Sequence, residues 1–247
     1  MANWNDEQST RPGFGTAPGL SGDVATRTTF DAGLRSHMLS IYNYMTSGVL
    51  LTGIVALLAY NGGYALNFAS GPLMWIVALS PLAIVMAMSF GAARFSKGTL
   101  QMLFWGFAVL MGLSMSTIFL RFTGGSIAVT FFATAGAFAG LSLFGYTTQK
   151  NLTGMGSFLI MGVFGLILAM LLNMWLQSPG LMYAISALGV LIFAGLTAYD
   201  TQRLKNEYAH VRGTEWAGKA VVLGALTLYL DFINMFQFLL SFLGNRE

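Results

Sequence analysis

Two aspartates, Asp200 and Asp231, are the only acidic residues inside or against the long apolar stretches of this 247-residue chain. An ionised carboxylate in a bilayer costs roughly 2.5–3.5 kcal/mol even on the lenient insertion scale, so such residues usually have a function. Two carboxyls at close range cannot both ionise cheaply, and near neutral pH we expect them to share one proton. Their oxygens also suit hard cations such as Ca²⁺. The pair therefore indicates a site sensitive to protons and cations.

The spacing of the two aspartates predicts a helical hairpin that brings them together. The midpoint between them falls near Glu215, and Gly213 and Thr214 make that region the expected apex. Each aspartate then lies about 15 residues along its own helix, roughly 22 Å from the apex at a rise of about 1.5 Å per residue. We therefore expect the pair at matching depth in the cytoplasmic half of the membrane.

Other polar residues share the faces of the two aspartates. Thr227, Asp231 and Asn234 follow one another at steps of four and three, which places them on one polar stripe of an otherwise apolar helix. Thr197 shares a face with Asp200 on the preceding helix. This arrangement predicts that both carboxyls point into the protein. A pair of hydrogen-bonded carboxyls that only fastens two helices together remains the structural alternative.

Arg94 ends the second apolar stretch and is a candidate third member of the site. Its long side chain can reach inward to the carboxylates, as a gating latch, or outward to lipid headgroups as a topology signal. The residue alone does not decide between the two.

The composition places the chain in the membrane. It is 55% hydrophobic and 9% charged, whereas soluble domains carry about 25% charged residues. The absence of cysteine excludes disulfides, thiolate catalysis and cysteine-based metal sites. No phosphate-binding loop and no serine with a histidine and an acid near it are present, so the sequence predicts neither an enzyme nor a cofactor. The basic residues fall in short loops rather than in a patch, which argues against nucleic acid.

Seven apolar stretches have about the 20 residues needed to cross a bilayer, which predicts an all-α protein with seven transmembrane helices. We expect a polar, disordered and then amphipathic tail over residues 1–35 and a transmembrane domain over residues 36–247. Gly136 and Gly140, four residues apart, predict a close helix contact. The expected spans are Met38–Tyr60, Pro72–Ala92, Leu100–Leu120, Ser126–Thr147, Met155–Leu176, Leu181–Asp200 and Ala220–Leu243.

The loop charges predict the orientation. Four segments on one side of the predicted bundle carry basic residues, while the loops between spans on the other side carry Arg121 alone. Because basic loops stay in the cytoplasm, the N-terminus is expected there. The basic residues of the first side are Arg27, Arg35, Arg94, Lys97, Lys150, Arg203, Lys205, Arg212 and Lys219.

The hairpin resembles the Bax inhibitor-1 family, specifically its bacterial, YbhL-like members. Three motifs carry the resemblance, which extends from about residue 30 to the end: GLTAYDTQRLKN at 195–206, LGALTLYLDFINMF at 223–236 and SLFGYTTQKNLTGMG at 142–156. The resemblance implies a bacterial inner-membrane protein whose last helix is enclosed by the other six. It also implies a pH-sensitive calcium leak.

In terms of residues, the resemblance implies that Asp200 and Asp231 are the family's di-aspartyl pH sensor, which would bind Ca²⁺ transiently. Arg94, in ARFSKG, lines up with an arginine that pairs with these aspartates in the closed state of some members. The implied partners are the lipid bilayer, Ca²⁺ and H⁺, and the implied cofactor is none.

Two other functions remain open at this point. The resemblance also allows a regulator that transports nothing and binds another membrane protein, such as a quality-control protease. An intramembrane aspartyl protease would use paired aspartates with a Tyr-Asp motif, as in Tyr199–Asp200. Such enzymes carry Gly-x-Gly before the second aspartate, where this chain has Leu228, Tyr229 and Leu230. Those bulky residues argue against a bound substrate strand.

Overall fold

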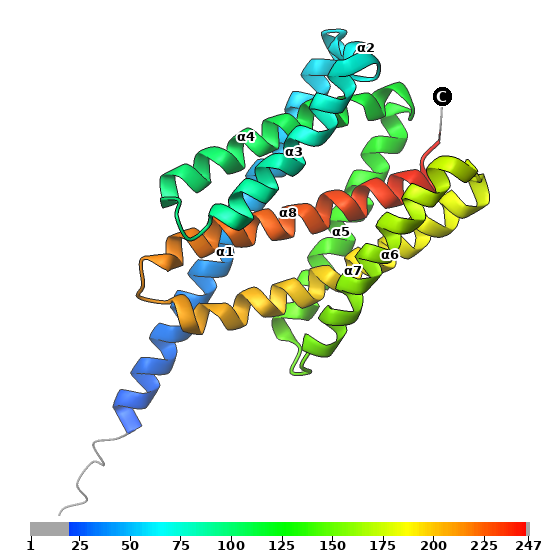
Figure 1. Cartoon of the computed structure of the whole chain (residues 1–247). Helices are drawn as coiled ribbons and strands as arrows, with labels where there is room; N and C mark the ends of the chain where they lie inside the picture. The colour runs from blue at the N-terminus through cyan, green and yellow to red at the C-terminus, as the bar shows by residue number, and fades with distance from the viewer. Residues whose placement is uncertain (1–19, 246–247) are drawn as a thin grey trace, which may run out of the picture. The chain divides into compact units, whose positions relative to one another are not determined.

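The computed structural model describes the backbone of residues 20–245 and the side chains of residues 29–245. This part of the chain contains helices and turns, with no extended strand element (Figure 1). Its elements in order are α1 (Leu20–Asn61), α2 (Tyr64–Phe68), α3 (Gly71–Gly91), α4 (Lys97–Met115), the 3₁₀ helix η1 (Ser116–Leu120), α5 (Gly124–Thr147), α6 (Thr153–Leu176), α7 (Pro179–Val211) and α8 (Trp216–Leu243).

Seven segments of the described chain are long and apolar enough to cross a membrane, which confirms the predicted number. The sixth predicted span continues as helix to Val211 instead of ending at Asp200. Hydropathy marks where the bilayer ends, whereas the straight-chain residues Gln202, Arg203 and Lys205 are good helix formers and continue the helix into water. The helix that contains the first span likewise begins before Met38, at Leu20.

The chain divides into two units, residues 1–36 and residues 37–247. In the first unit, the described residues 20–36 are helical and form the beginning of α1. The lead-in expected before the first span is therefore a helix. The sequence predicts a disordered tail from residue 1 onward, and residues 1–19 lie outside the described residues. The site is built within the second unit.

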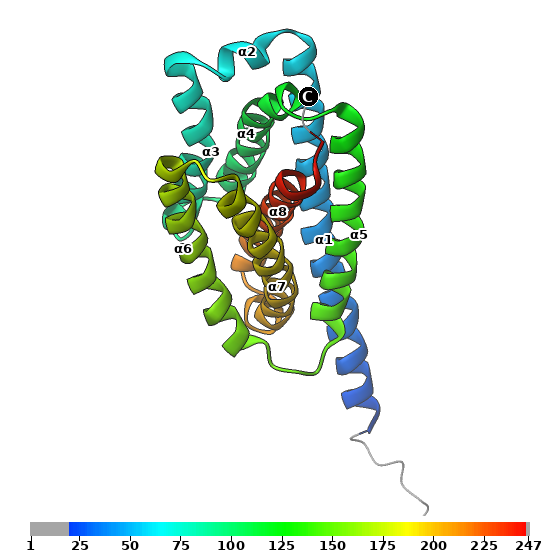
Figure 2. The ribbon, with the colours of Figure 1, turned by 90° about the vertical axis from the view of Figure 1, so that its right-hand side faces the viewer.

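Helix α8 is the most deeply buried of the seven spans. In its most apolar window 67% of the residues are buried, against 17–39% in the other spans. It packs most extensively on α7 and also on α5 and α4, and Figure 2 shows it in the middle of the helices of this unit. Helix α3 packs on α4 and α2, and α6 packs on α7. Complete enclosure of α8 by six helices therefore stays a prediction.

A buried hydrogen-bonded clamp fixes α8 against α1 and α4. The Tyr229 hydroxyl, fully buried on α8, lies 2.6 Å from the Thr52 hydroxyl of α1. Thr52 in turn donates to the carbonyl of Ala108 on α4 at 2.8 Å. The rings of Phe104 and Phe107 pack edge-on against Tyr229. Because buried polar groups are costly when unpaired, this chain of bonds specifies how the three helices sit together.

Close approach of α5 to α7 depends on a glycine other than the two predicted. A Cβ atom at Gly136 or Gly140 would meet nothing within 4 Å, so the predicted close contact is wrong within this chain. Both glycines are exposed on α5. At Gly145, by contrast, a Cβ atom would lie 2.2 Å from the carbonyl oxygen of Ala198 on α7. The small-residue spacing was present, but which face of α5 met another helix was a matter of tertiary packing.

Gly145→Ala is expected to lower the thermal stability of the purified protein. The added methyl group would collide with the α7 backbone two residues before Asp200, and overpacking of this kind costs about 1–3 kcal/mol. Gly136→Ala on the same helix is the matched control, and it should preserve or raise the melting temperature because alanine favours helix. Thermal unfolding in detergent measures both. Equal melting temperatures for the two variants would contradict the close α5–α7 contact.

Candidate functional site

A tight turn between α7 and α8 forms the predicted hairpin. Helix α7 ends at Val211 and α8 begins at Trp216. Gly213 has a φ of 74°, a left-handed conformation in which a side chain would be strained. The Thr214 hydroxyl donates to the carbonyl of Val211 at 2.7 Å, which closes the last turn of α7. The predicted apex at Gly213 and Thr214 is therefore confirmed.

The hairpin brings the two aspartates together. Asp200 of α7 is 6% exposed and Asp231 of α8 is 4% exposed. Their carboxyl groups lie within hydrogen-bonding distance of each other. The Oδ2 atom of Asp231 is buried and has no hydrogen-bond partner among the described residues. An unpaired buried acceptor is costly, so this oxygen is available to a proton, a water molecule or a cation.

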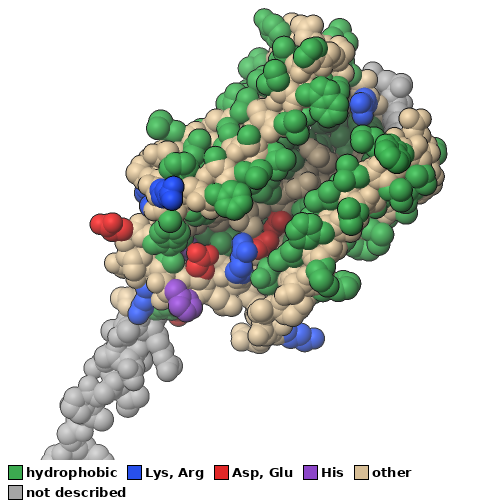
Figure 3. Space-filling view, in the orientation of Figure 1, with side chains coloured by type: hydrophobic (Ala, Val, Ile, Leu, Met, Phe, Trp, Pro, Cys, Tyr) green, Lys and Arg blue, Asp and Glu red, His purple; other side chains and the backbone are tan. Residues whose placement is uncertain are grey.

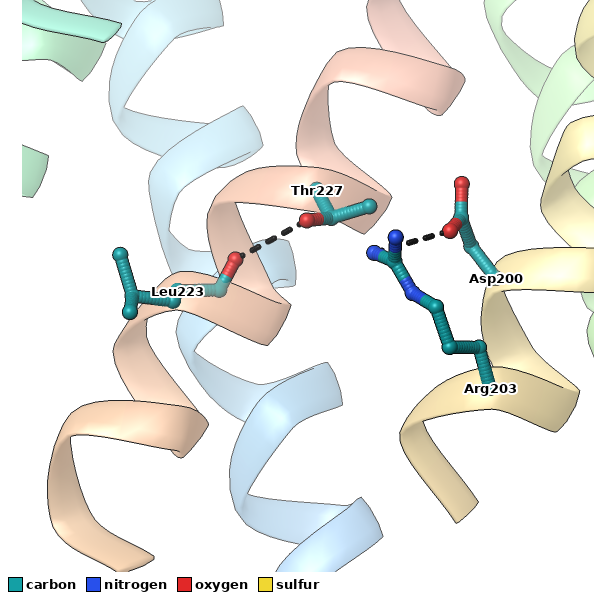
Figure 4. Close-up of polar contacts among 4 residues, drawn as sticks. All are labelled: Asp200, Arg203, Leu223 and Thr227. Atoms are coloured by element: carbon teal, nitrogen blue, oxygen red, sulfur yellow. Dashed lines mark hydrogen bonds and ion pairs between the residues drawn. The ribbon is translucent and has the colours of Figure 1, made fainter. Parts of the chain in front are cut away.

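Arg203 supplies the positive charge beside the pair. Its guanidinium NH2 atom lies 2.9 Å from Oδ1 of Asp200, one turn earlier on α7 (Figure 4). The guanidinium also lies over the ring of Tyr199, 5.9 Å from its centre. The Arg203 side chain is 46% exposed whereas that of Asp200 is 8% exposed, so the ion pair lies at the boundary between the buried site and its surroundings.

Sequence reasoning missed Arg203 and named Arg94. The signal for Arg203 was available, because an aspartate followed three residues later by an arginine on a helix places the two side chains together. In the structure Arg94 lies in the turn after α3 and is exposed. Within residues 29–245, the ion pair of the two aspartates is the one with Arg203. The role of Arg94 as a latch stays a prediction.

The three other predicted polar residues bond to their own helices. The Thr197 hydroxyl donates to the carbonyl of Phe193 at 2.8 Å, and Thr227 donates to Leu223 at 3.2 Å. Figure 4 shows Thr227 on the side of α8 that faces the Arg203 guanidinium. The Asn234 amide donates to the α8 backbone in the same way, at 2.8 Å. The two hydroxyl donors and one of the two N–H groups of the Asn234 amide are satisfied locally, so these residues offer the site mainly acceptor oxygens.

The polar end of α7 is fastened to α5 and to the α5–α6 connection. Gln202 accepts a hydrogen bond from the backbone of Leu152 at 2.9 Å and donates to the carbonyl of Lys150 at 2.8 Å. Lys205 donates to the carbonyl of Tyr146 at 2.7 Å and lies over its ring. These bonds hold the part of α7 that follows Asp200 against α5 and the α5–α6 connection. Asp200 is therefore carried by a helix whose position is fixed by its neighbours.

The donor set suits a passing cation better than a resident one. Among the described residues, no group of three or more histidine, cysteine, aspartate or glutamate side chains could hold a metal ion. Ca²⁺ takes 6–8 oxygen ligands. Two carboxyls would have to be completed by water and by neutral oxygens, which favours weak and brief binding.

The comparison with known families agrees with this geometry. Residues 34–247 match the family described as "Inhibitor of apoptosis-promoting Bax1". The matched residues include all seven spans apart from the first residues of α1. The chain belongs to the Bax inhibitor-1 family. This Bax inhibitor-1 protein is similar to the inner membrane protein YbhL of Escherichia coli strain K12, with 45% identity over 87% of this chain and 94% of YbhL.

Other bacterial relatives of this Bax inhibitor-1 chain span similar lengths. An uncharacterized protein of Caulobacter vibrioides is 48% identical over 88% of this chain and 92% of its own. An uncharacterized membrane protein of Streptococcus pyogenes is 30% identical over 91% of this chain and 99% of its own. Together with the seven apolar helices, these likenesses support an inner-membrane protein.

Gln202→Leu is expected to destabilise the protein, because it leaves the Leu152 amide and the Lys150 carbonyl without their partner. Loss of such buried bonds costs about 1–3 kcal/mol, which lowers the melting temperature. Gln202→Glu keeps the acceptor for Leu152 but loses the donor, so it should fall between the leucine variant and wild type. Asn206→Ala, at an exposed position one turn later, is the control. A wild-type melting temperature for Gln202→Leu would show that these bonds do not hold α7.

Proposed function

We propose that this protein is a pH-sensitive leak for Ca²⁺ across a bacterial inner membrane, controlled by the Asp200–Asp231 pair. The observation that carries the proposal is the contact of two buried carboxyls from separate transmembrane helices, one with an unpartnered oxygen. An ionisable group inside a membrane protein marks an ion or proton path by default. Two such groups in contact respond to both kinds of ion.

The charge balance of the site supports regulation by protons. With one shared proton, Asp200, Asp231 and Arg203 together carry no net charge. When that proton leaves, the site carries one negative charge, which attracts a cation. Ca²⁺ would then compete with the Arg203 guanidinium for the oxygens of Asp200. In this mechanism Arg203 is a tethered cation that a passing ion must displace.

The helix packing suggests which helix moves when the aspartate pair loses its proton. Helix α7 is held to α5 and the α5–α6 connection by Gln202 and Lys205, and α8 is held to α1 and α4 by Tyr229. Helix α3 packs mainly on α2 and α4. We propose that loss of the proton shifts α3 relative to α8, with Arg94 at the end of α3 following that motion. We propose a cytoplasmic N-terminus in this scheme, because basic loops tend to stay in the cytoplasm.

The surroundings of Asp231 favour an ion over a peptide as the substrate. Leu228 and Tyr229, in the turn before it, are completely buried. Tyr229 is also bonded to Thr52, so this segment has no free backbone face for a substrate strand. An aspartyl protease would also need a water between two carboxyls free to exchange roles, whereas Asp200 is paired with Arg203.

Asp231→Asn and Asp200→Asn are expected to abolish the pH dependence of Ca²⁺ flux, because neither variant can share a proton between two carboxyls. We expect flux to fall by about tenfold, equal to about 1.4 kcal/mol of lost cation stabilisation. The measurement is dye-reported Ca²⁺ entry into proteoliposomes over a pH series. Glu215→Gln, exposed in the α7–α8 turn, is the control and should behave as wild type. Unchanged flux and pH dependence in both aspartate variants would refute the proposal.

Arg203→Gln is expected to move the half-maximal pH of the flux upward, because the ionised pair loses its positive neighbour and holds its proton more readily. Arg94→Gln removes an equal charge from an exposed turn and serves as the comparison. A shift in Arg203→Gln alone assigns the counter-ion role to Arg203. A shift in Arg94→Gln alone would assign it to the predicted latch and contradict the role proposed for Arg203.

A further inference from the structure

One face of α8 departs from the burial of the rest of the helix. Six residues at alternating steps of four and three are half-buried or exposed, while nearly all others between residues 222 and 240 are buried. Four of the six are polar. We call this set the α8 line: Leu223, Thr227, Leu230, Asn234, Gln237 and Ser241.

The α8 line continues well past the aspartate pair, away from the α7–α8 turn. At about 1.5 Å per residue, Gln237 lies roughly 9 Å and Ser241 roughly 15 Å beyond Asp231 along the helix. Ser241 accepts a hydrogen bond of 3.1 Å from Ser186 of α7, whose side chain is completely buried. The predicted polar stripe stopped at Asn234, so these residues belong to no part of the site already described.

Gln237 is the most informative member of the α8 line. Its side chain is exposed although it lies within a membrane span. A glutamine amide carries two donors and two acceptor lone pairs, and among residues 29–245 no hydrogen bond of this side chain is found. A polar group left unpaired in hydrocarbon costs several kcal/mol, so polar groups at this depth line water or bond to protein. The surface beside Gln237 indicates whether its amide meets water or another part of the protein.

The surface of the protein is hollowed into a trough beside α8. In Figure 3 the surface is hollowed between two banks of hydrophobic side chains, and acidic atoms are visible toward one end of the hollow. The same orientation in Figure 1 shows α8 running between α3 and α6, and Figure 2 shows α3 and α6 on one side of α8. The apolar banks would face lipid, and we infer that the incompletely buried α8 line forms the floor between them.

The other sides of α8 offer no comparable path. Toward α7, the ring of Phe238 stacks on Phe193, and a Cβ atom at Gly189 would lie 2.5 Å from that ring. Toward α1 and α5, Ile233 and Phe236 line a half-open pocket of about 300 Å³ whose walls are almost wholly apolar. Such walls offer water no hydrogen-bond partners.

We propose that Asn234, Gln237 and Ser241, which Ser186 of α7 holds by a hydrogen bond, line a hydrated pathway from the aspartate pair to the membrane face opposite the α7–α8 turn. Neutral amide and hydroxyl oxygens would replace part of the hydration shell of a passing cation without trapping it. The aspartates then remain the one charged step along the route. The use of this pathway for Ca²⁺ rests on the proposed function, whereas its hydration can be tested independently.

The test uses single cysteines, because the chain contains none of its own. Asn234→Cys, Gln237→Cys and Ser241→Cys are exposed in cells to a membrane-impermeant cationic thiol reagent added to the face opposite the turn. We expect all three to be modified. Leu191→Cys is the matched control, because this α7 residue is 68% exposed and lies about 14 Å beyond Asp200 at 1.5 Å per residue. Its thiol would face lipid, where it does not ionise to the thiolate that reacts with the reagent.

Two further controls make the labelling decisive. Ile233→Cys, in the apolar pocket, should stay unmodified, and Glu215→Cys in the exposed turn should react only from the other face. Modification of Gln237→Cys with Leu191→Cys unmodified supports the hydrated line. An unreactive Gln237→Cys, or equal reaction of Leu191→Cys, overturns it.

Flux measurements separate this inference from the proposed function. The attached cationic group on Gln237→Cys should block Ca²⁺ flux, and Gln237→Leu should lower it roughly tenfold while the half-maximal pH stays that of wild type. A labelled Gln237→Cys that conducts normally would show that ions pass elsewhere and would overturn the pathway. Absence of flux in wild type would instead contradict the leak, and the labelling result would still decide whether the line is hydrated.

Discussion

The contact between two buried carboxyls is the constraint on which the rest of this structure depends. Asp200 and Asp231 are each more than nine-tenths buried, in a protein where a charge is costly. They lie close enough to share a proton, and Arg203 offsets the remaining charge. A proton shared between them, together with the adjacent guanidinium, would make this burial tolerable. In the proposed leak, a change in proton or cation occupancy would therefore change the forces between α7 and α8.

The helices around this pair divide into fastened and looser elements. Helix α7 is bonded through Gln202 and Lys205, and α8 through Tyr229, so the carboxyls themselves have little freedom to separate. Helix α3 packs on α4 and α2 and borders the trough beside α8. In the proposed leak, a change of charge between α7 and α8 would act on α3, whose end at Ala92 accepts a hydrogen bond of 3.4 Å from Lys219 of α8.

Much of this arrangement could be predicted from residue types and spacing. Seven spans followed from hydropathy, and the hairpin apex followed from Gly213 and Thr214 near the midpoint between the aspartates. The prediction failed where distant parts of the chain decide the contacts. Gly136 and Gly140 had the spacing of a helix contact, yet Gly145 makes the close approach to α7. Arg203, adjacent on the same helix, was overlooked in favour of Arg94, which the structure leaves exposed.

The sequence by itself determined the membrane class, the number of spans and the pairing of Asp200 with Asp231. These depend on hydrophobic length and on a local turn, both of which are encoded over short stretches. Only the tertiary structure decided which carboxyl oxygen lacks a partner and which face of α8 opens to a trough. Those features depend on where α3, α6 and α7 lie around α8. Helical periodicity places residues on one face, but neighbouring helices decide whether that face meets protein, lipid or water.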